Sequence, residues 1–157
     1  MSKYEEGMKL MEEAFGNYKD NLISLATISL EKTAAGEPCP SVRVVDCYYE
    51  DGTFYAVTNA KSNKMLQIEQ NAEISIASSA EMFNASAIGE NLGWAMDEKN
   101  ARIREKLHKT FEAWYDMANN DSCKDCVYLA IHLTKGILNI NHWEKLYHMD
   151  FVNQTCD

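Results

Sequence analysis

The ten residues from Val57 to Leu66, V-T-N-A-K-S-N-K-M-L, decide the predicted fold. They begin inside the run Thr53 to Thr58, which is rich in β-branched and aromatic residues and follows an Asp-Gly turn, so it predicts a strand. Ser62 stands where a helix N-cap is expected, and the apolar helix positions after it are Met65, Leu66 and Ala72. The stretch therefore predicts a strand that leads directly into a helix.

This strand-to-helix junction has the chemistry of an anion site. Backbone N–H groups at the start of a helix are free and carry a partial positive charge. The hydroxyls of Thr58 and Ser62 and the ammonium groups of Lys61 and Lys64 would face the same point, which suits a phosphate monoester. A capped surface helix with two solvated lysines would show the same pattern, so both interpretations stay open on this segment alone.

The strand before the turn, Ser41 to Tyr49, carries one arginine, Arg43. Because the Asp51-Gly52 turn joins this strand to the next, the two should pair antiparallel and bring Arg43 to the end of the sheet where Lys64 lies. A guanidinium group among β-branched residues is unfavourable unless it meets an anion, and its planar fork suits a phosphate. The alternative is an arginine on the polar face of a half-exposed strand.

Taken together, these residues resemble the FMN-binding split-barrel family, which includes pyridoxamine 5'-phosphate oxidase and the general-stress flavoproteins. The resemblance runs from about Asn21 to His148 and rests on an Arg-x-Val strand, a strand ending in V-T-N, the Ser-x-Lys of residues 62–64 and the strand E-I-S-I-A of residues 73–77. It implies a mainly β fold with flanking α-helices (α+β), a six-stranded antiparallel split β-barrel formed by residues 1–157 as a single domain.

The resemblance also implies a cofactor site, in which FMN lies at the interface of a homodimer. Arg43 and Lys64 would hold the FMN phosphate, with Lys61 and Ser62 beside them. The backbone of the strand pair would face the flavin ring and the ribityl chain, through Val44, Val45, Val57, Thr58 and Asn59. The partner chain would contribute Asn84 and Trp143.

One departure concerns the substrate. In pyridoxamine 5'-phosphate oxidase a C-terminal Arg-Leu-His-x-Arg segment helps to hold the substrate, whereas residues 142–148 here read H-W-E-K-L-Y-H and lack both arginines. The resemblance therefore implies an FMN-dependent oxidoreductase of the general-stress type, acting on an unidentified small molecule with an electron donor such as NAD(P)H. Oxidation of pyridoxamine 5'-phosphate itself is not expected.

Three alternatives remain open. The first is a non-catalytic flavin-binding or flavin-storage protein, which would share every feature above. The second is a split barrel that binds haem or a deazaflavin, in which case His132, His142 or His148 would be the candidate axial ligand of a haem. The third is a structural dimer whose cofactor site has decayed.

Composition narrows the partners and the compartment. The chain has 157 residues, enough for one domain, and its 15 basic and 24 acidic residues give a net charge of -9. That charge argues against nucleic acids and anionic membranes as partners. No stretch approaches the ~18 to 20 apolar residues that a membrane span needs, and the first residues lack the profile of a signal peptide. Five cysteines fit a reducing compartment, so we expect a cytoplasmic protein.

Apolar periodicity predicts the remaining elements. A three-to-four-residue step indicates an amphipathic helix over residues 4–18 and a second helix over residues 97–117. β-branched and alternating runs indicate further strands at residues 22–30, 74–79 and 82–89, and a closing strand or strand pair at residues 127–133 and 136–141.

The sequence Cys123-Lys124-Asp125-Cys126 has a spacing that serves zinc sites, redox dithiols and structural thiols. A zinc site needs a second closely spaced ligand pair, and neither Cys39 with Cys47 nor the four histidines supply one. A redox dithiol usually lies at a helix N-terminus, whereas this pair lies between a predicted helix and a predicted strand. We favour structural thiols and predict no metal site, with the zinc and redox roles left open.

Overall fold

The computed structural model describes residues 1–157, which form one antiparallel sheet with helices around it. The strands are β1 (Asn21–Ile28), β2 (Pro40–Glu50), β3 (Thr53–Asn59), β4 (Glu73–Ala77), β5 (Asn84–Trp94), β6 (Cys126–Ile140), β7 (Lys145–Asp150) and β8 (Thr155–Cys156). The helices are α1 (Lys3–Phe15), α2 (Asn63–Gln70), α3 (Ala101–Thr110) and α4 (Tyr115–Ala118), with short 3₁₀ turns at Ala80–Met82 and Glu98–Asn100.

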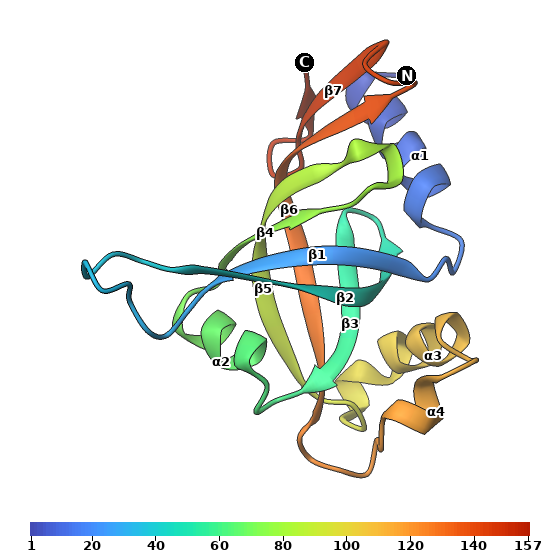
Figure 1. Ribbon diagram of the computed structural model, residues 1–157. Coiled ribbons are helices and arrows are strands. Elements are labelled where there is room, and N and C mark those ends of the chain that lie inside the picture. The colour runs from blue at the N-terminus through green and yellow to red at the C-terminus, as the bar shows by residue number, and fades with distance from the viewer.

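Six of the strands close into a barrel. The strand order is β3-β2-β1-β4-β5-β6-β7-β8, and β3 also pairs with β6, so the ring closes at β6 while β7 and β8 extend the sheet beyond it (Figure 1). All pairings are antiparallel. The predicted six-stranded antiparallel barrel with flanking helices is confirmed, and so is the β2–β3 hairpin, whose turn is Asp51-Gly52.

The barrel interior holds the main core, which follows from the period-two alternation of the strands. Helix α1 covers one end of the barrel, where Phe15 meets Phe54 and Phe83 with ring centroids 5.4 and 5.6 Å apart. A second, smaller core lies outside the barrel, where Leu107 and Phe111 of the α3 region pack against Tyr48 and other residues of β2, β3 and β6. The two cores bury opposite faces of the same strands.

Helix α2 lies at the other side of the barrel from α1 (Figure 1). Its buried apolar residues are Met65 and Ile68, and the close packing against β5 depends on Gly89. A Cβ atom at this position would lie 2.9 Å from Cγ2 of Ile68, closer than carbon atoms approach, so only glycine lets the helix sit this near to the strand. This contact fixes the position of α2 over the barrel.

Several predicted details are wrong. Leu66 is 37% exposed and Ala72 lies beyond the end of α2, so neither is a packed helix position. The predicted helix over residues 97–117 is broken into a 3₁₀ turn, α3 and α4, and Met117 is 84% exposed. Of the two alternatives given for residues 127–133 and 136–141, the single closing strand is confirmed as β6, whereas β7 and β8 were not predicted. None of the helices has the length and apolar character needed to cross a membrane.

Candidate functional site

The junction between β3 and α2 is a tight polar turn. The Asn59 side-chain Oδ1 accepts a hydrogen bond from the Lys61 N–H at 2.8 Å, and the Asn59 carbonyl accepts one from the Ser62 N–H at 3.0 Å. Ser62 is the N-cap residue of α2, as predicted, but its hydroxyl makes no capping hydrogen bond and lies 3.5 Å from the Thr58 hydroxyl instead. The first N–H groups of α2 are therefore left to bind an external acceptor.

Arg43 is held in place by neutral acceptors only. Its Nη1 donates to the Thr27 hydroxyl at 2.7 Å and to the Leu25 carbonyl at 3.2 Å, and its Nη2 donates to Oε1 of Gln67 at 2.8 Å and to the Ser41 hydroxyl at 3.1 Å. These contacts fix the guanidinium plane between β1, β2 and α2. No carboxylate pairs with it, so its charge remains uncompensated within the chain.

Lys64, on the first turn of α2, is the second uncompensated cation. Its side chain is half-buried and has neither an ion pair nor a hydrogen bond within the chain. Burial lowers the pKa of Lys64, and the nearby charge of Arg43 lowers the pKa further. Burial likewise lowers the pKa of Arg43. Two cations that repel each other in a partly buried place gain most from an anion between them.

Lys61 stands apart from these two cations. Its Nζ lies 3.1 Å from Oδ2 of Asp125, and its side chain is exposed. The backbone reinforces this connection, because the Ala60 N–H donates to the Asp125 carbonyl at 2.8 Å. Lys61 therefore faces the Cys123–Cys126 turn in this structure, and it could reach an anion beside Lys64 only by giving up Asp125.

The remaining predicted residues of the strand pair point in different directions. Val44 lies on the outer face of β2 and is 62% exposed, whereas Val45 is buried in the barrel core. Val57 packs against the second core beside α3, Thr58 is buried, and Asn59 is exposed at the end of β3. Val44 and Asn59 thus have exposed side chains, whereas Val45 and Val57 face the two cores and the Thr58 hydroxyl faces that of Ser62.

Asn84 and Trp143 do not join the cluster within one chain. Asn84 is exposed at the start of β5, on the wall of an open depression of about 500 Å³ between β4 and β8. Trp143 is 67% exposed in the turn between β6 and β7. That turn lies near α1 and away from α2 (Figure 1). The structure thus brings together Arg43, Thr58, Ser62 and Lys64, and leaves Asn84 and Trp143 elsewhere on the chain.

Two residues of the cluster were missed by sequence reasoning. Gln67 is a buried polar residue of α2, and its Oε1 accepts from both Arg43 and the Thr27 hydroxyl, the latter at 2.5 Å. Thr27 is 1% exposed. The one available signal was the position of Gln67 one turn after Lys64, on the face that also carries the buried Ile68.

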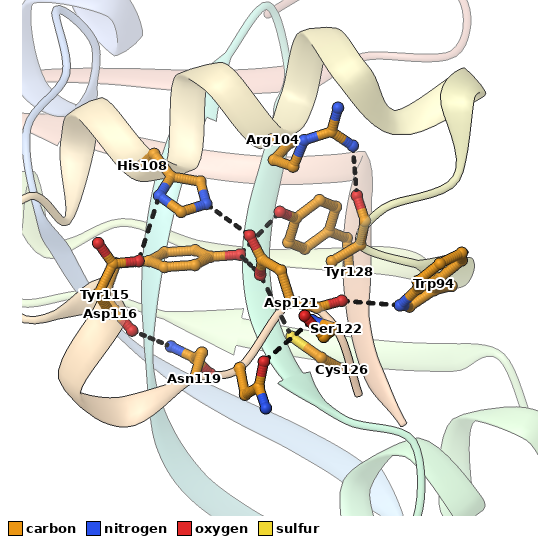
Figure 2. A network of polar contacts seen from close by, with 12 residues as sticks. Trp94, Arg104, His108, Tyr115, Asp116, Asn119, Asp121, Ser122, Cys126 and Tyr128 are labelled. Carbon is orange, nitrogen blue, oxygen red and sulfur yellow. Dashed lines mark hydrogen bonds and ion pairs between the residues drawn. The ribbon is translucent and has the colours of Figure 1, made fainter. Parts of the chain in front are cut away.

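A separate polar network lies between α3, α4 and the start of β6 (Figure 2). The Asp121 carboxylate accepts from the Tyr115 hydroxyl at 2.6 Å and meets His108 Nε2 at 2.7 Å, and the Tyr115 and Tyr128 hydroxyls are 2.7 Å apart. Cys126 donates its S–H to the same carboxylate at 3.7 Å. No group of three or more His, Cys, Asp or Glu side chains is arranged to hold a metal ion.

Comparison with known proteins identifies the architecture. Neither a protein-family model nor a curated protein matches the sequence. Among solved structures, a protein related to general stress protein 26 of Bacillus subtilis (pyridoxinephosphate oxidase family), from Clostridium acetobutylicum, matches with a TM-score of 0.62 and 13% identity over 99% of this chain and 100% of that one. The chain has the split-barrel fold.

Other solved structures with a similar fold are named for other ligands. A heme binding protein from Mycobacterium smegmatis matches with a TM-score of 0.65 and 14% identity, over 98% of this chain and 60% of that one. An F420 reductase matches with a TM-score of 0.56 and 15% identity, over 80% of this chain and 94% of that one. At these identities the likeness establishes the fold and not the ligand.

Proposed function

We propose that this split barrel is an FMN-binding flavoprotein whose Arg43 and Lys64 hold the cofactor phosphate. The observation that carries the proposal is the pair of partly buried cations that no carboxylate neutralises, in a chain whose net charge is -9. Beside them, the uncapped start of α2 and the Thr58 and Ser62 hydroxyls supply neutral donors. A phosphate monoester satisfies both cations and the helix start at once.

The outer face of the sheet supports a homodimer with FMN between its chains. Leu22, Val42 and Val44 are 67%, 69% and 62% exposed there. Two rows cross four strands on this face without a charged side chain, namely Val44, Ser24, Ala77 and Asn84 and then Val42, Ala26, Ser75 and Ser86. We propose that a second copy covers this face, with Asn84 and Trp143 of that copy beside the flavin.

The histidines favour a flavin over haem. An axial histidine must present a ring nitrogen to an apolar pocket. His132 instead meets Glu90 at 3.0 Å and Thr53 at 3.4 Å, and His142 lies in the exposed β6–β7 turn. His148 lines the open depression between β4 and β8, but most of the residues around that depression are polar. Although one structural neighbour is a heme binding protein, the residues of this chain support haem binding less than they support a phosphate-bearing cofactor. FMN and F420 both belong to that class of cofactor.

Bound FMN would supply the redox chemistry, and the chain would supply binding and orientation. The residues of the cluster hold the phosphate, and no general acid or base converges on it. We propose an oxidoreductase that acts on a small molecule with a reductant such as NAD(P)H. A non-catalytic flavin-binding protein would have the same site, so turnover of NAD(P)H by the FMN-loaded protein separates the two.

The test compares FMN with riboflavin, which lacks the phosphate. Wild type should retain FMN after removal of free ligand, with flavin absorption bands. Lys64→Ala should weaken FMN binding by about tenfold or more, the loss expected for one hydrogen bond to a charged group, and leave riboflavin binding unchanged. Lys32→Ala, at an exposed loop lysine, serves as the matched control.

Two results would overturn the proposal. If wild type retains no FMN, the protein is not an FMN-binding protein. If Lys64→Ala binds FMN as tightly as wild type, Lys64 does not hold the phosphate. Riboflavin also guards against misfolding, because a variant that loses both ligands has lost more than a phosphate contact. F420 in place of FMN tests the deazaflavin alternative in the same assay.

A further inference from the structure

The Cys123–Cys126 segment is a β-turn attached to the anion site. The Cys126 N–H donates to the Cys123 carbonyl at 3.0 Å, which is the hydrogen bond that closes a four-residue turn. The end residues of such a turn have Cα atoms less than about 7 Å apart, and a disulfide spans about 4.4 to 6.8 Å between Cα atoms. Both thiols are free in this structure. The turn therefore holds the two Cα atoms at a separation that a disulfide can span.

The two thiols differ in their surroundings. Cys123 is exposed, so it is open to an oxidant. Cys126 is buried and donates to the Asp121 carboxylate (Figure 2). Burial first, and then the charge of Asp121, raise the pKa of Cys126 to about 11. The reduced form thus gains nothing from a stabilised Cys126 thiolate, the property that makes other dithiols resist oxidation.

Side-chain and backbone contacts on both sides of the turn also hold it in place. Lys124, in its centre, lies over the Trp94 ring with Nζ 3.2 Å from the centroid, and the Trp94 indole N–H donates to the Asp121 carbonyl at 2.8 Å. Asp125, the other central residue, pairs with Lys61 and accepts from the Ala60 N–H. Cys126 itself pairs with Asn59 in the β3–β6 ladder. A change in the conformation of the turn would therefore be transmitted to residues 59–61, which precede α2.

We propose that Cys123 and Cys126 form a reversible intrachain disulfide that controls whether Lys61 is available to the anion site. The oxidant is an organic disulfide. The Cys123 thiolate attacks one of its sulfur atoms and releases the first thiol, and the Cys126 sulfur, losing its proton, then attacks Cys123 and releases the second. Two protein thiols are oxidised and one disulfide is reduced to two thiols.

The control of Lys61, which rests on the proposed function, follows from the entropy of its ion pair. An exposed ion pair is weak because two mobile side chains must be held in one geometry. A disulfide across the turn orders Asp125, so the Lys61–Asp125 pair becomes more persistent and competes better with a phosphate for the Lys61 ammonium. Oxidised protein should therefore bind FMN about twofold to fivefold more weakly than reduced protein, the range that an exposed ion pair supplies.

The disulfide is tested by mass, independently of FMN. The protein is treated with oxidised glutathione, the remaining thiols are alkylated, and the protein is digested without reduction. Trypsin cuts after Lys124, so the disulfide would join the peptides of residues 110–124 and 125–135, which separate on reduction. We expect this linked pair in wild type, and in Cys126→Ser a glutathione adduct that persists on Cys123. A persistent adduct on Cys123 in wild type, or two alkylated thiols, would overturn the proposal.

The coupling is tested by FMN titration of reduced and oxidised protein, with Asp125→Asn as the matched variant. We expect the redox dependence of FMN affinity in wild type and its loss in Asp125→Asn, which still forms the disulfide but offers Lys61 no carboxylate. Equal affinities in both redox states of wild type would overturn the coupling. A wild type that binds no FMN in either state refutes the proposed function and the coupling together, whereas the disulfide is decided by the peptide masses alone.

Discussion

Replacing Asp46 by asparagine should stabilise the protein at alkaline pH. Oδ1 of Asp46 is buried without a hydrogen-bond donor. Burial first, and then the hydrogen bond to Asp20 and its charge, raise the pKa of Asp46 from 3.8 to about 7. An acid with a higher pKa in the folded chain than in the unfolded chain contributes stability that is complete below about pH 4 and is lost as the pH rises through about 7.

The size of this loss follows from the pKa. One pKa unit corresponds to about 1.36 kcal/mol. A folded pKa of about 7 against 3.8 therefore means that ionisation of Asp46 can lower the free energy of unfolding by at most about 4 kcal/mol. Because Asp46 is partly exposed, solvent screening reduces this limit, and we expect about 1 to 2 kcal/mol. Asp46→Asn has no charge to lose, and its amide can donate to Asp20. The variant should therefore be more stable than wild type by that amount at pH 8.

The assay is urea unfolding followed by circular dichroism at several pH values between 5 and 8. The difference between Asp46→Asn and wild type should grow with pH over this range. Glu112→Gln, at an exposed residue, makes the same charge change and should show no such growth. A difference that stays constant with pH, or a variant less stable than wild type at pH 8, would show that the ionised carboxyl is satisfied and would refute the reasoning.

Four further substitutions test the packing and the outer face. Leu107→Ala, at a fully buried position, should lower the free energy of unfolding by about 2 to 5 kcal/mol, while Met117→Ala, at an exposed one, should change it by less than about 0.5 kcal/mol. Tyr115→Phe removes two hydrogen bonds of the Figure 2 network and should cost about 1 to 3 kcal/mol, read by thermal unfolding. Val44→Asp places a charge on the exposed outer face and should convert a dimer into a monomer, which light scattering would detect as a halved molecular mass. An unchanged mass would contradict the proposed interface.

Much of the barrel could be predicted because its signals are local. The Asp51-Gly52 turn and the alternating strands on either side of it specify a hairpin within a few residues, and the structure has that hairpin. The prediction of one helix over residues 97–117 was wrong because contacts with distant residues outweigh the helical spacing of its apolar residues. Trp114 leaves the helical conformation, its indole N–H lies 3.3 Å from Asp20, and the Tyr115 hydroxyl meets Asp121 and Tyr128.

The anion site was predictable only in part, for the same reason. Thr58, Ser62 and Lys64 lie within seven residues, so one short motif contains them. Apart from Ser41, the acceptors that orient Arg43 come from β1 and α2, with Thr27 sixteen and Gln67 twenty-four residues away in the sequence. No local pattern encodes such contacts. The pairing of Lys61 with Asp125 is more distant still, since it depends on β6 returning beside β3.

Strand β6 is shared by the barrel and by the C-terminal extension of the sheet. Its first part pairs with β3 and β5 and closes the barrel, and its last part pairs with β7 and carries the C-terminal extension. The two parts meet at Thr134, where the pairing of β6 with β5 shifts register, and the β7 pairing begins at the next residue. Because β7 pairs only with this last part of β6 and with the two-residue β8, its amide hydrogens should exchange with solvent by local opening of the extension, faster than those of β6 within the barrel.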